Sequence, residues 1–170
     1  MATVNLKGNP FKLAGKLPEV GDAAPEVSLA GADLSEKKVG GAQGKTQILV
    51  VVPSVDTPVC ATETRKFNES AAAVPGAEIT VISMDLPFAA KRFCAAEGIK
   101  NVSTASDFRR KEFAKAYGVL IAEGPLEGLT CRAIFIVGKD GRLAYKQLVP
   151  EVSQEPDYAA ALAAADSVPV

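Results

Sequence analysis

The stretch that decides the fold is Ile48-Leu-Val-Val-Val52 followed by Pro53-Ser-Val-Asp-Thr57-Pro-Val-Cys60. The first five residues are apolar, mostly β-branched and bounded by polar positions, which predicts a buried strand. From about Ala61 to Ala73, apolar and aromatic residues recur at intervals of three and four, which predicts a helix. The chain therefore passes from a strand through a polar turn into a helix, and this unit is typical of layered α/β folds.

Cys60 lies where the turn enters the helix. The first N–H groups of a helix have no intrahelical partner, and the helix dipole is positive at that end. A cysteine in this position tends to be a thiolate, which is the nucleophilic form. Two prolines, Pro53 and Pro58, stiffen the turn, and the hydroxyl of Thr57 is placed to donate a hydrogen bond to the sulfur. On spacing alone, a second interpretation stays open, in which Cys60 is a small buried hydrophobic residue.

The order of the remaining elements predicts the fold class. Besides the central unit, we expect strands at Thr3–Leu6, Phe11–Ala14, Val27–Leu29, Ser35–Val39, Ile79–Met84, Val102–Ala105, Ile134–Val137 and Leu143–Lys146, the first two forming a hairpin. We expect helices at Pro87–Glu97, Lys111–Tyr117 and Asp157–Ala165. This order predicts an α/β, thioredoxin-like three-layer fold with a mixed central sheet and an N-terminal β-hairpin extension. No linker or repeat divides residues 1–170, so we expect a single domain.

The composition excludes several classes of site. The chain of 170 residues has a net charge of −1 and contains no histidine. We therefore expect no Ser–His or Cys–His hydrolase site and no zinc site that uses histidine. The three cysteines are too few for a four-thiolate site, and none are spaced C-x-x-C. We expect no metal and no cofactor, and the near-neutral charge does not indicate nucleic acid or a membrane as a partner.

The N-terminal sequence and the short apolar runs predict a cytoplasmic location. Residues 1–7 contain no apolar core of a signal peptide. In a reducing compartment, a disulfide between any of the three cysteines is expected to be transient and catalytic. Without histidine, the activation of a cysteine must come from fixed charge and dipoles.

The segment Pro53-x-x-x-Thr57-x-x-Cys60 resembles the active-site signature of the peroxiredoxins. Its continuation through Glu63, Arg65 and Phe67 resembles the thiol peroxidase branch, the atypical two-cysteine type. The similarity runs along nearly the whole chain. Further segments that agree are Ser83-Met-Asp-Leu-Pro-Phe-Ala89, Arg92-Phe-Cys94, Tyr117-Gly-Val119, Gly124-Pro-Leu126 and Glu155-Pro-Asp-Tyr158.

This resemblance implies roles for five residues. Cys60 would be the peroxidatic cysteine, Thr57 its hydroxyl partner and Pro53 the residue that shields the thiolate. Cys94 matches the resolving cysteine, and Arg132 matches the arginine whose guanidinium lies beside the peroxidatic sulfur. The resemblance also implies a hydroperoxide substrate, an intramolecular Cys60–Cys94 disulfide, thioredoxin as the reductant and a homodimer. No metal or organic cofactor is implied.

Two features of the cysteines bear on this resemblance. Cys131 stands directly before Arg132, and because neighbours on a strand face opposite sides, we expect a buried core thiol there. Cys60 and Cys94 fall on different predicted helices, so a disulfide would require one or both helix starts to unwind.

Two other functions remain as alternatives. One is a dithiol oxidoreductase or redox sensor, and the other is a non-enzymatic α/β binding domain whose thiols fill the core.

Overall fold

The structure is a computed structural model that describes residues 2–168. In chain order its elements are β1 (Thr3–Leu6), β2 (Asn9–Ala14), β3 (Val27–Gly31), β4 (Glu36–Val39), β5 (Thr46–Val51), α1 (Pro58–Ser70), the 3-10 turn η1 (Ala71–Ala73), β6 (Ala77–Ser83), α2 (Pro87–Glu97), β7 (Ser103–Ser106), α3 (Glu112–Ala116), β8 (Leu120–Ile121), β9 (Ala133–Val137), β10 (Leu143–Leu148) and α4 (Tyr158–Ser167). Within residues 2–168, no helix combines the length and apolar character needed to cross a membrane.

Seven strands form the main sheet, in the order β10-β9-β5-β6-β7-β3-β4. The central strand β5 pairs in parallel with β6 and antiparallel with β9, so the predicted mixed sheet is confirmed. All six residues of β5 are buried. A strand covered on both faces has no polar side, which explains the uninterrupted apolar run in the sequence.

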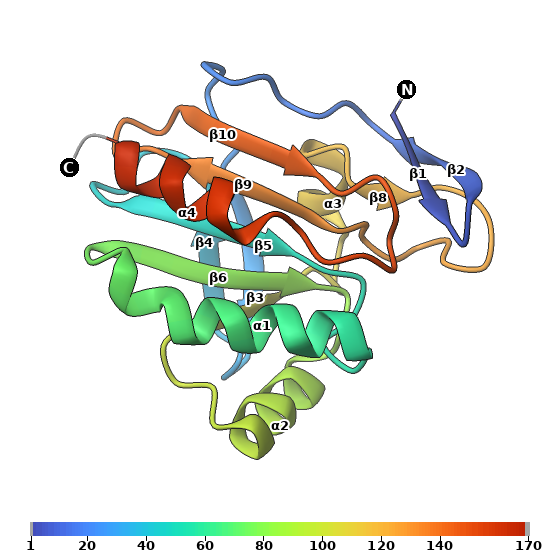
Figure 1. Ribbon diagram of the computed structural model, residues 1–170, viewed down its shortest axis with the longest axis horizontal. Coiled ribbons are helices and arrows are strands. Elements are labelled where there is room, and N and C mark those ends of the chain that lie inside the picture. Colours follow the sequence, from blue (N-terminus) through green and yellow to red (C-terminus); the bar gives the residue numbers. More distant parts are fainter. Residues whose placement is uncertain (1, 169–170) are drawn as a thin grey trace.

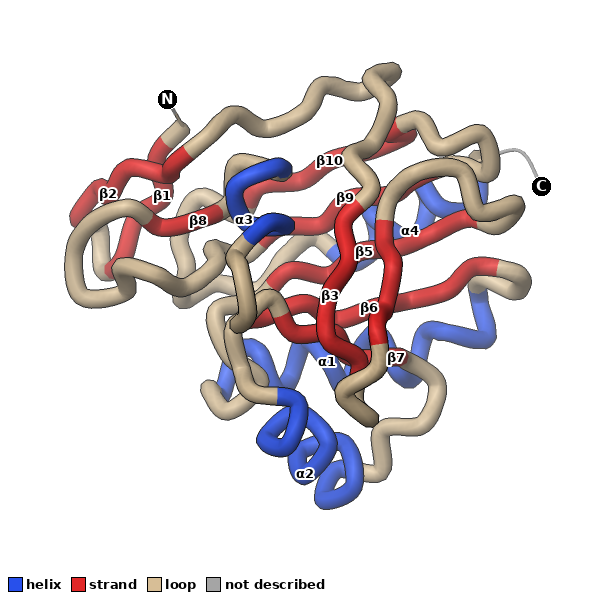
Figure 2. The backbone as a smooth tube through the Cα atoms, turned by 180° about the vertical axis from the view of Figure 1, so that it is seen from behind, coloured by secondary structure: helices blue, strands red, loops and turns tan. Residues whose placement is uncertain are grey.

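The two faces of the sheet carry separate hydrophobic clusters, and the predicted three layers are confirmed (Figure 1). Side chains alternate along β5, so Ile48 and Val50 face the layer of α1 and α4. Leu49 and Val51 face the opposite layer, which contains α3. Figure 2 views the molecule from this side, with α3 toward the viewer. The catalytic candidate Cys60 belongs to the first of these clusters.

The N-terminal extension is a hairpin whose second strand also pairs with β8. Its turn is tighter than predicted, because Lys7 and Gly8 both have positive φ (51° and 81°) and form a two-residue connection. The strand after the turn therefore begins at Asn9 rather than Phe11. The strand β8 was not predicted, since two residues are too few to show an alternating pattern.

Helix α1 begins at Pro58, three residues earlier than predicted, and its last predicted residues form the separate turn η1. Proline is favoured at the first helical position because its φ is already helical and its missing N–H has no partner there anyway. As a result, Cys60 is the third residue of the first helical turn. Helix α2 has the predicted bounds and ends at Gly98, whose φ is 66°.

Candidate active site

Cys60 is held at the end of β5, inside the layer between the main sheet and α1. Its side chain is fully buried, with 0% exposure, and packs in the cluster that contains Val52 and Ile134. It lies in the first turn of α1, where the N–H groups of the helix start are not used by the helix itself. The predicted position of Cys60 at a helix start agrees with the structure. Its burial is what the second interpretation expected, so burial alone does not separate the two.

The turn before Cys60 is anchored by a carboxylate from the next strand. Asp85, just after β6, accepts hydrogen bonds from Ser54 Oγ at 2.7 Å and from the Val55 N–H at 2.8 Å. Ser83 Oγ also donates to Asp85, at 2.7 Å. On the other side, Thr130 Oγ1 donates to the Val52 carbonyl at 2.7 Å. These contacts fix the backbone on which Cys60 is presented.

Thr57 and Pro53 lie in this anchored turn. Pro53 is buried, and Thr57 is the exposed N-cap residue of α1. The hydroxyl of Thr57 donates to the Ser54 carbonyl at 3.1 Å. Since a hydroxyl has one proton to donate, Thr57 has to leave that carbonyl before it can donate to Cys60. The role of Thr57 toward the sulfur therefore stays a prediction.

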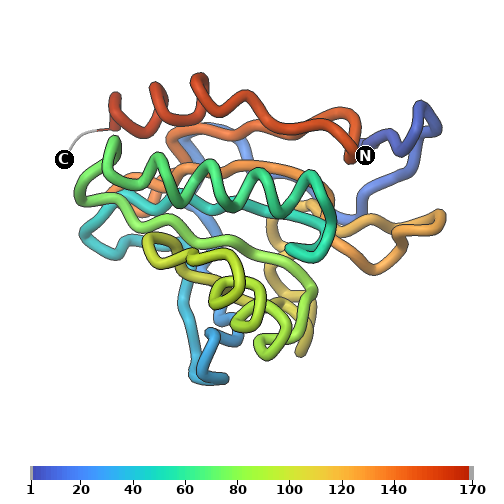
Figure 3. Tube along the Cα trace, turned by 60° about the horizontal axis from the view of Figure 1, so that its bottom comes forward, coloured from blue at the N-terminus to red at the C-terminus, as the bar shows by residue number. Residues whose placement is uncertain are grey.

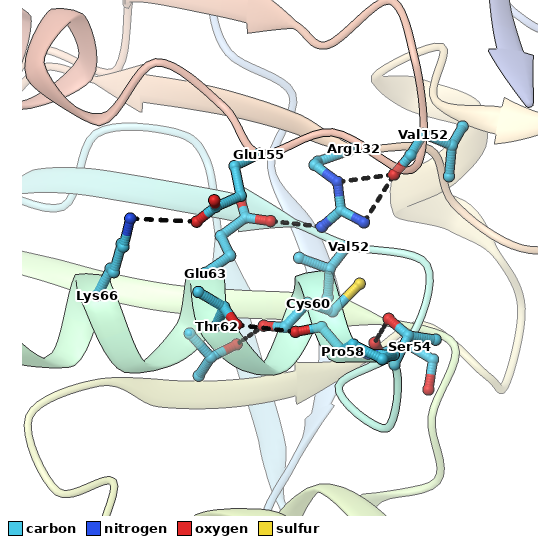
Figure 4. A network of polar contacts seen from close by, with 12 residues as sticks. Val52, Ser54, Pro58, Cys60, Thr62, Glu63, Lys66, Arg132, Val152 and Glu155 are labelled. Carbon is cyan, nitrogen blue, oxygen red and sulfur yellow. Dashed lines mark hydrogen bonds and ion pairs between the residues drawn. The ribbon is translucent and has the colours of Figure 1, made fainter. Parts of the chain in front are cut away.

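Arg132 is buried beside Cys60, with 2% of its surface exposed (Figure 4). Its Nε and Nη2 both donate to the carbonyl of Val152, at 3.0 and 2.8 Å. Its Nη1 donates to Glu63 Oε2 at 2.6 Å. Figure 4 shows the Cys60 sulfur on the side of α1 that faces the guanidinium. The structure thus brings together Cys60 and Arg132, which are far apart in the sequence.

The electrostatics of this group are those of a buried ion cluster. Burial opposes the charge of Arg132, but the anionic forms of Cys60 and Glu63 outweigh it and raise the pKa of Arg132 above its ordinary value. Burial raises the pKa of Glu63 from 4.5 to about 7, although Arg132 pulls it down. Glu63 is 0% exposed and its Oε1 has no hydrogen-bond partner. Arg132 is therefore the fixed positive charge of the site.

Cys94 lies outside this cluster. It is half-buried on α2 and lines a cavity of about 290 Å³ with Asp33, Lys91, Val102 and other residues, none of which belongs to α1. Burial raises the pKa of its thiol. All three cysteines are free thiols in the structure. The structure does not bring Cys94 to Cys60, so their pairing remains a prediction.

Comparisons with known proteins identify the family. The family model described as Redoxin matches residues 19–162. The chain belongs to the redoxin family. A thiol peroxidase of Campylobacter jejuni is 58% identical over 159 residues, which is 94% of this chain and 90% of the relative. A thiol peroxidase of Aquifex aeolicus is 57% identical over 156 residues, 92% of each chain.

A solved structure agrees with the sequence relatives. The crystal structure of a peroxiredoxin-like protein from Aquifex aeolicus superimposes with a TM-score of 0.94 at 54% identity, covering 98% of this chain and 96% of that one. The thioredoxin-like fold and the resemblance to thiol peroxidases are both confirmed.

Two groups that contact Arg132 in the candidate site have no role predicted from the sequence. Glu63 follows Cys60 by three residues, so one helical turn places both on the same side of α1, and this spacing was a usable signal. The carbonyl of Val152 could not have been found, because a backbone oxygen carries no residue type. Only the path of the chain after β10 brings it to Arg132.

Proposed function

We propose that this protein is a peroxidase that reduces hydrogen peroxide and alkyl hydroperoxides through Cys60. The observation that carries the proposal is the buried guanidinium of Arg132 beside a cysteine in the first turn of a helix. A fixed charge in a site with little water acts more strongly than the same charge at the surface. Together with the helix N-terminus, it supports a reactive thiolate in a chain without histidine.

In the first step, the thiolate of Cys60 attacks one oxygen of the peroxide and the O–O bond breaks. The sulfur becomes a sulfenic acid, and the departing oxygen leaves as water or an alcohol after it takes up a proton. Negative charge moves from the sulfur to the departing oxygen during this step. We expect Arg132 and the N–H groups at the start of α1 to stabilise that charge, which would lower the barrier.

The peroxide has to reach a sulfur that is fully buried. Asp56, Thr57 and Pro58 form the exposed edge of the turn, directly over the start of α1. We expect this edge to open to admit a peroxide. The same motion would free the Thr57 hydroxyl from the Ser54 carbonyl, so that it could donate to the substrate or the sulfur.

In the second step, the Cys94 thiol condenses with the sulfenic acid, releasing water and forming a Cys60–Cys94 disulfide. Since Cys94 sits on α2 and Cys60 on α1, this requires the start of one or both helices to unwind. A dithiol reductant, thioredoxin by family resemblance, then restores both thiols by exchange. We further propose a homodimer that works in the cytoplasm.

One experiment tests the cycle. Peroxide consumption is followed with thioredoxin, thioredoxin reductase and NADPH for wild type, Cys60→Ser and Cys94→Ser. We expect Cys60→Ser to lose even a single stoichiometric turnover. Cys94→Ser should consume one equivalent of peroxide but fail to cycle. A wild type that exchanges disulfides yet leaves peroxide untouched would refute the proposed function and favour a disulfide oxidoreductase.

A further inference from the structure

The segment 149–155, between β10 and α4, passes over the active site and holds Arg132. The N–H of Val149 donates to the Arg132 carbonyl at 3.0 Å, which aligns the two backbones. Three residues further on, the carbonyl of Val152 accepts from both Nε and Nη2 of the Arg132 side chain. Val152 is 4% exposed, so this oxygen is shielded from competing water.

The Val152 carbonyl fixes where the guanidinium can lie. Two of the three guanidinium nitrogens of Arg132 bind this one oxygen, and the third binds Glu63. Because the guanidinium is planar and rigid, its plane and its distance from Cys60 are set by these two acceptors. Glu63 is held within α1, but Val152 lies in a segment without secondary structure of its own. Something else must hold Val152 in place.

The N-terminal hairpin supplies that support. The N–H of Val152 donates to the Asn5 carbonyl at 2.9 Å, and the N–H of Asn5 donates to the Pro150 carbonyl at 2.7 Å. Asn5 and Glu151 thereby form a parallel bridge between β1 and the segment 149–155. Figures 1 and 3 show the hairpin beside this segment, at the side of the molecule away from the C-terminus.

A single carboxylate ties the hairpin turn to the same segment. Glu151 accepts the N–H of Lys7 on Oε1 at 2.9 Å and the N–H of Gly8 on Oε2 at 3.2 Å. The positive φ angles of the turn point these two N–H groups to one side, which makes a small anion site. Hydrogen bonds from the Ser153 side chain and the Lys7 N–H hold the pKa of Glu151 below its ordinary value. The Glu151 carboxylate, which we call the hairpin clamp, is therefore charged at neutral pH.

We propose that the hairpin β1–β2 is a positioning device for the active site, and that Glu151 is its positioning residue. Glu151 does not touch the reacting atoms. It fixes the segment 149–155 against the hairpin, which places the Val152 carbonyl, which in turn places the Arg132 guanidinium next to Cys60. This inference rests on the proposed function, because it assigns a kinetic consequence to the position of Arg132.

The kinetic test is a double-mutant cycle between Glu151→Ala and Arg132→Lys. All proteins carry Cys94→Ser, so that only the oxidation of Cys60 by hydrogen peroxide is measured. We expect Glu151→Ala to slow this step about tenfold, since small displacements of a catalytic group have large effects. In the Arg132→Lys background the same change should have no further effect. Glu151→Gln keeps one acceptor oxygen and should recover part of the rate.

A matched control comes from the other side of the hairpin. Glu123 Oε1 accepts the N–H of Lys12 at 3.0 Å, so it also ties a carboxylate to a hairpin N–H, but from the loop after β8. Glu123→Ala should leave the rate within twofold of the parent protein. Equal losses for Glu123→Ala and Glu151→Ala would overturn the proposal, because they would reflect general loosening of the hairpin.

A second readout does not depend on peroxidase activity. The Nε–H of Arg132 donates to Val152 and gives an NMR signal whose exchange with solvent reports that hydrogen bond. We expect its exchange to be faster in Glu151→Ala and unchanged in Glu123→Ala. An unchanged signal in Glu151→Ala would refute the positioning role. If the signal responds but the wild type does not reduce peroxide, the proposed function fails while the positioning of Arg132 stands.

Discussion

The surroundings of Cys60 and Cys94 differ in almost every physical respect. Cys60 is fully buried, and the turn that leads to it is fixed by Asp85 and Thr130. A buried guanidinium, itself held by Glu63 and Val152, lies beside it. Cys94 is half-buried beside a cavity on α2, where only Pro87 and Ala90 are buried, whereas α1 buries four residues.

This difference suits two different tasks. A peroxide-reactive thiolate requires charges that are in place before the reaction starts, since any reorganisation adds to the barrier. A resolving thiol instead has to travel, and a helix with few buried side chains opens at a low free energy. The contrast fits the proposed cycle, in which Cys60 stays in place for the reaction with peroxide and Cys94 moves to meet it. The following predictions test each half of it.

Among the tests of this contrast that leave both cysteines in place, Arg132→Lys has the largest expected effect. Lysine keeps the charge, but its single ammonium cannot bind Val152 and Glu63 in the geometry of a planar guanidinium. We expect kcat/KM for hydrogen peroxide to fall about a hundredfold, as when one preorganised donor is lost. The matched control is Arg142→Lys, at an exposed arginine that donates to the Gly21 carbonyl at 2.9 Å. A rate for Arg132→Lys within threefold of wild type would contradict the fixed-charge account.

The next prediction concerns the mobility of the two helices. In the reduced protein, we expect amides of residues 88–98 to exchange with deuterium at least about tenfold faster than those of residues 61–70, because α2 buries so little. Oxidation to the disulfide should increase exchange in both segments, which have to unwind. Hydrogen exchange with mass spectrometry checks both points. Indistinguishable reduced and oxidised forms around 57–66 and 88–98 would rule out the unwinding.

The sequence predicted the parts of the molecule that depend on local pattern. Correct predictions, apart from shifts of a few residues, were the buried strand at 48–52, the helix after it and the bounds of α2. Each follows from neighbouring residues, such as an apolar run or the proline and glycine at the two ends of α2. Helix α1 was placed three residues late because the apolar periodicity starts after Pro58, although proline at a first helical position was a sufficient signal. Strand β8 was missed because only pairing with β2 makes it a strand.

The site itself was predicted in two ways. The helix-start position of Cys60 followed from its neighbours in the sequence, whereas the approach of Arg132 came from family resemblance. No local pattern brings residue 132 to residue 60, because their contact depends on β9 lying beside β5 in the sheet. The contacts of the Val152 carbonyl and of the Glu151 carboxylate could not be predicted from the sequence at all. Both depend on backbone atoms that meet only after the chain has crossed the sheet.

A third prediction tests whether Glu63 belongs to the fixed cluster around Cys60. Its pKa is raised to about 7 in the folded protein, against an ordinary value of 4.5. Between these values the folded state binds more protons than the unfolded state, so the free energy of unfolding falls as pH rises from about 4.5 to about 7. The full effect is at most about 3 kcal/mol. In Glu63→Gln this contribution should disappear.

Urea denaturation from pH 5 to pH 7.5 measures this difference. The chain has no histidine, so few other groups titrate in this window, and subtracting the two curves isolates Glu63. We expect the wild-type curve to fall relative to that of Glu63→Gln as pH rises. Parallel curves would show that Glu63 is ionised at an ordinary pH and that its burial is balanced by Arg132.

The smallest effect on activity is expected for Cys131→Ser. Cys131 is fully buried in the cluster on the opposite face of the sheet from Cys60, and burial raises the pKa of its thiol to about 12. We therefore expect it to be neither a nucleophile nor a partner of the sulfenic acid in the proposed cycle. The peroxidase rate should stay within twofold of wild type, while the buried hydroxyl lowers the free energy of unfolding by about 1–3 kcal/mol. A folded but inactive Cys131→Ser would instead assign the resolving role to Cys131, and the contrast between a fixed Cys60 and a mobile Cys94 would fail.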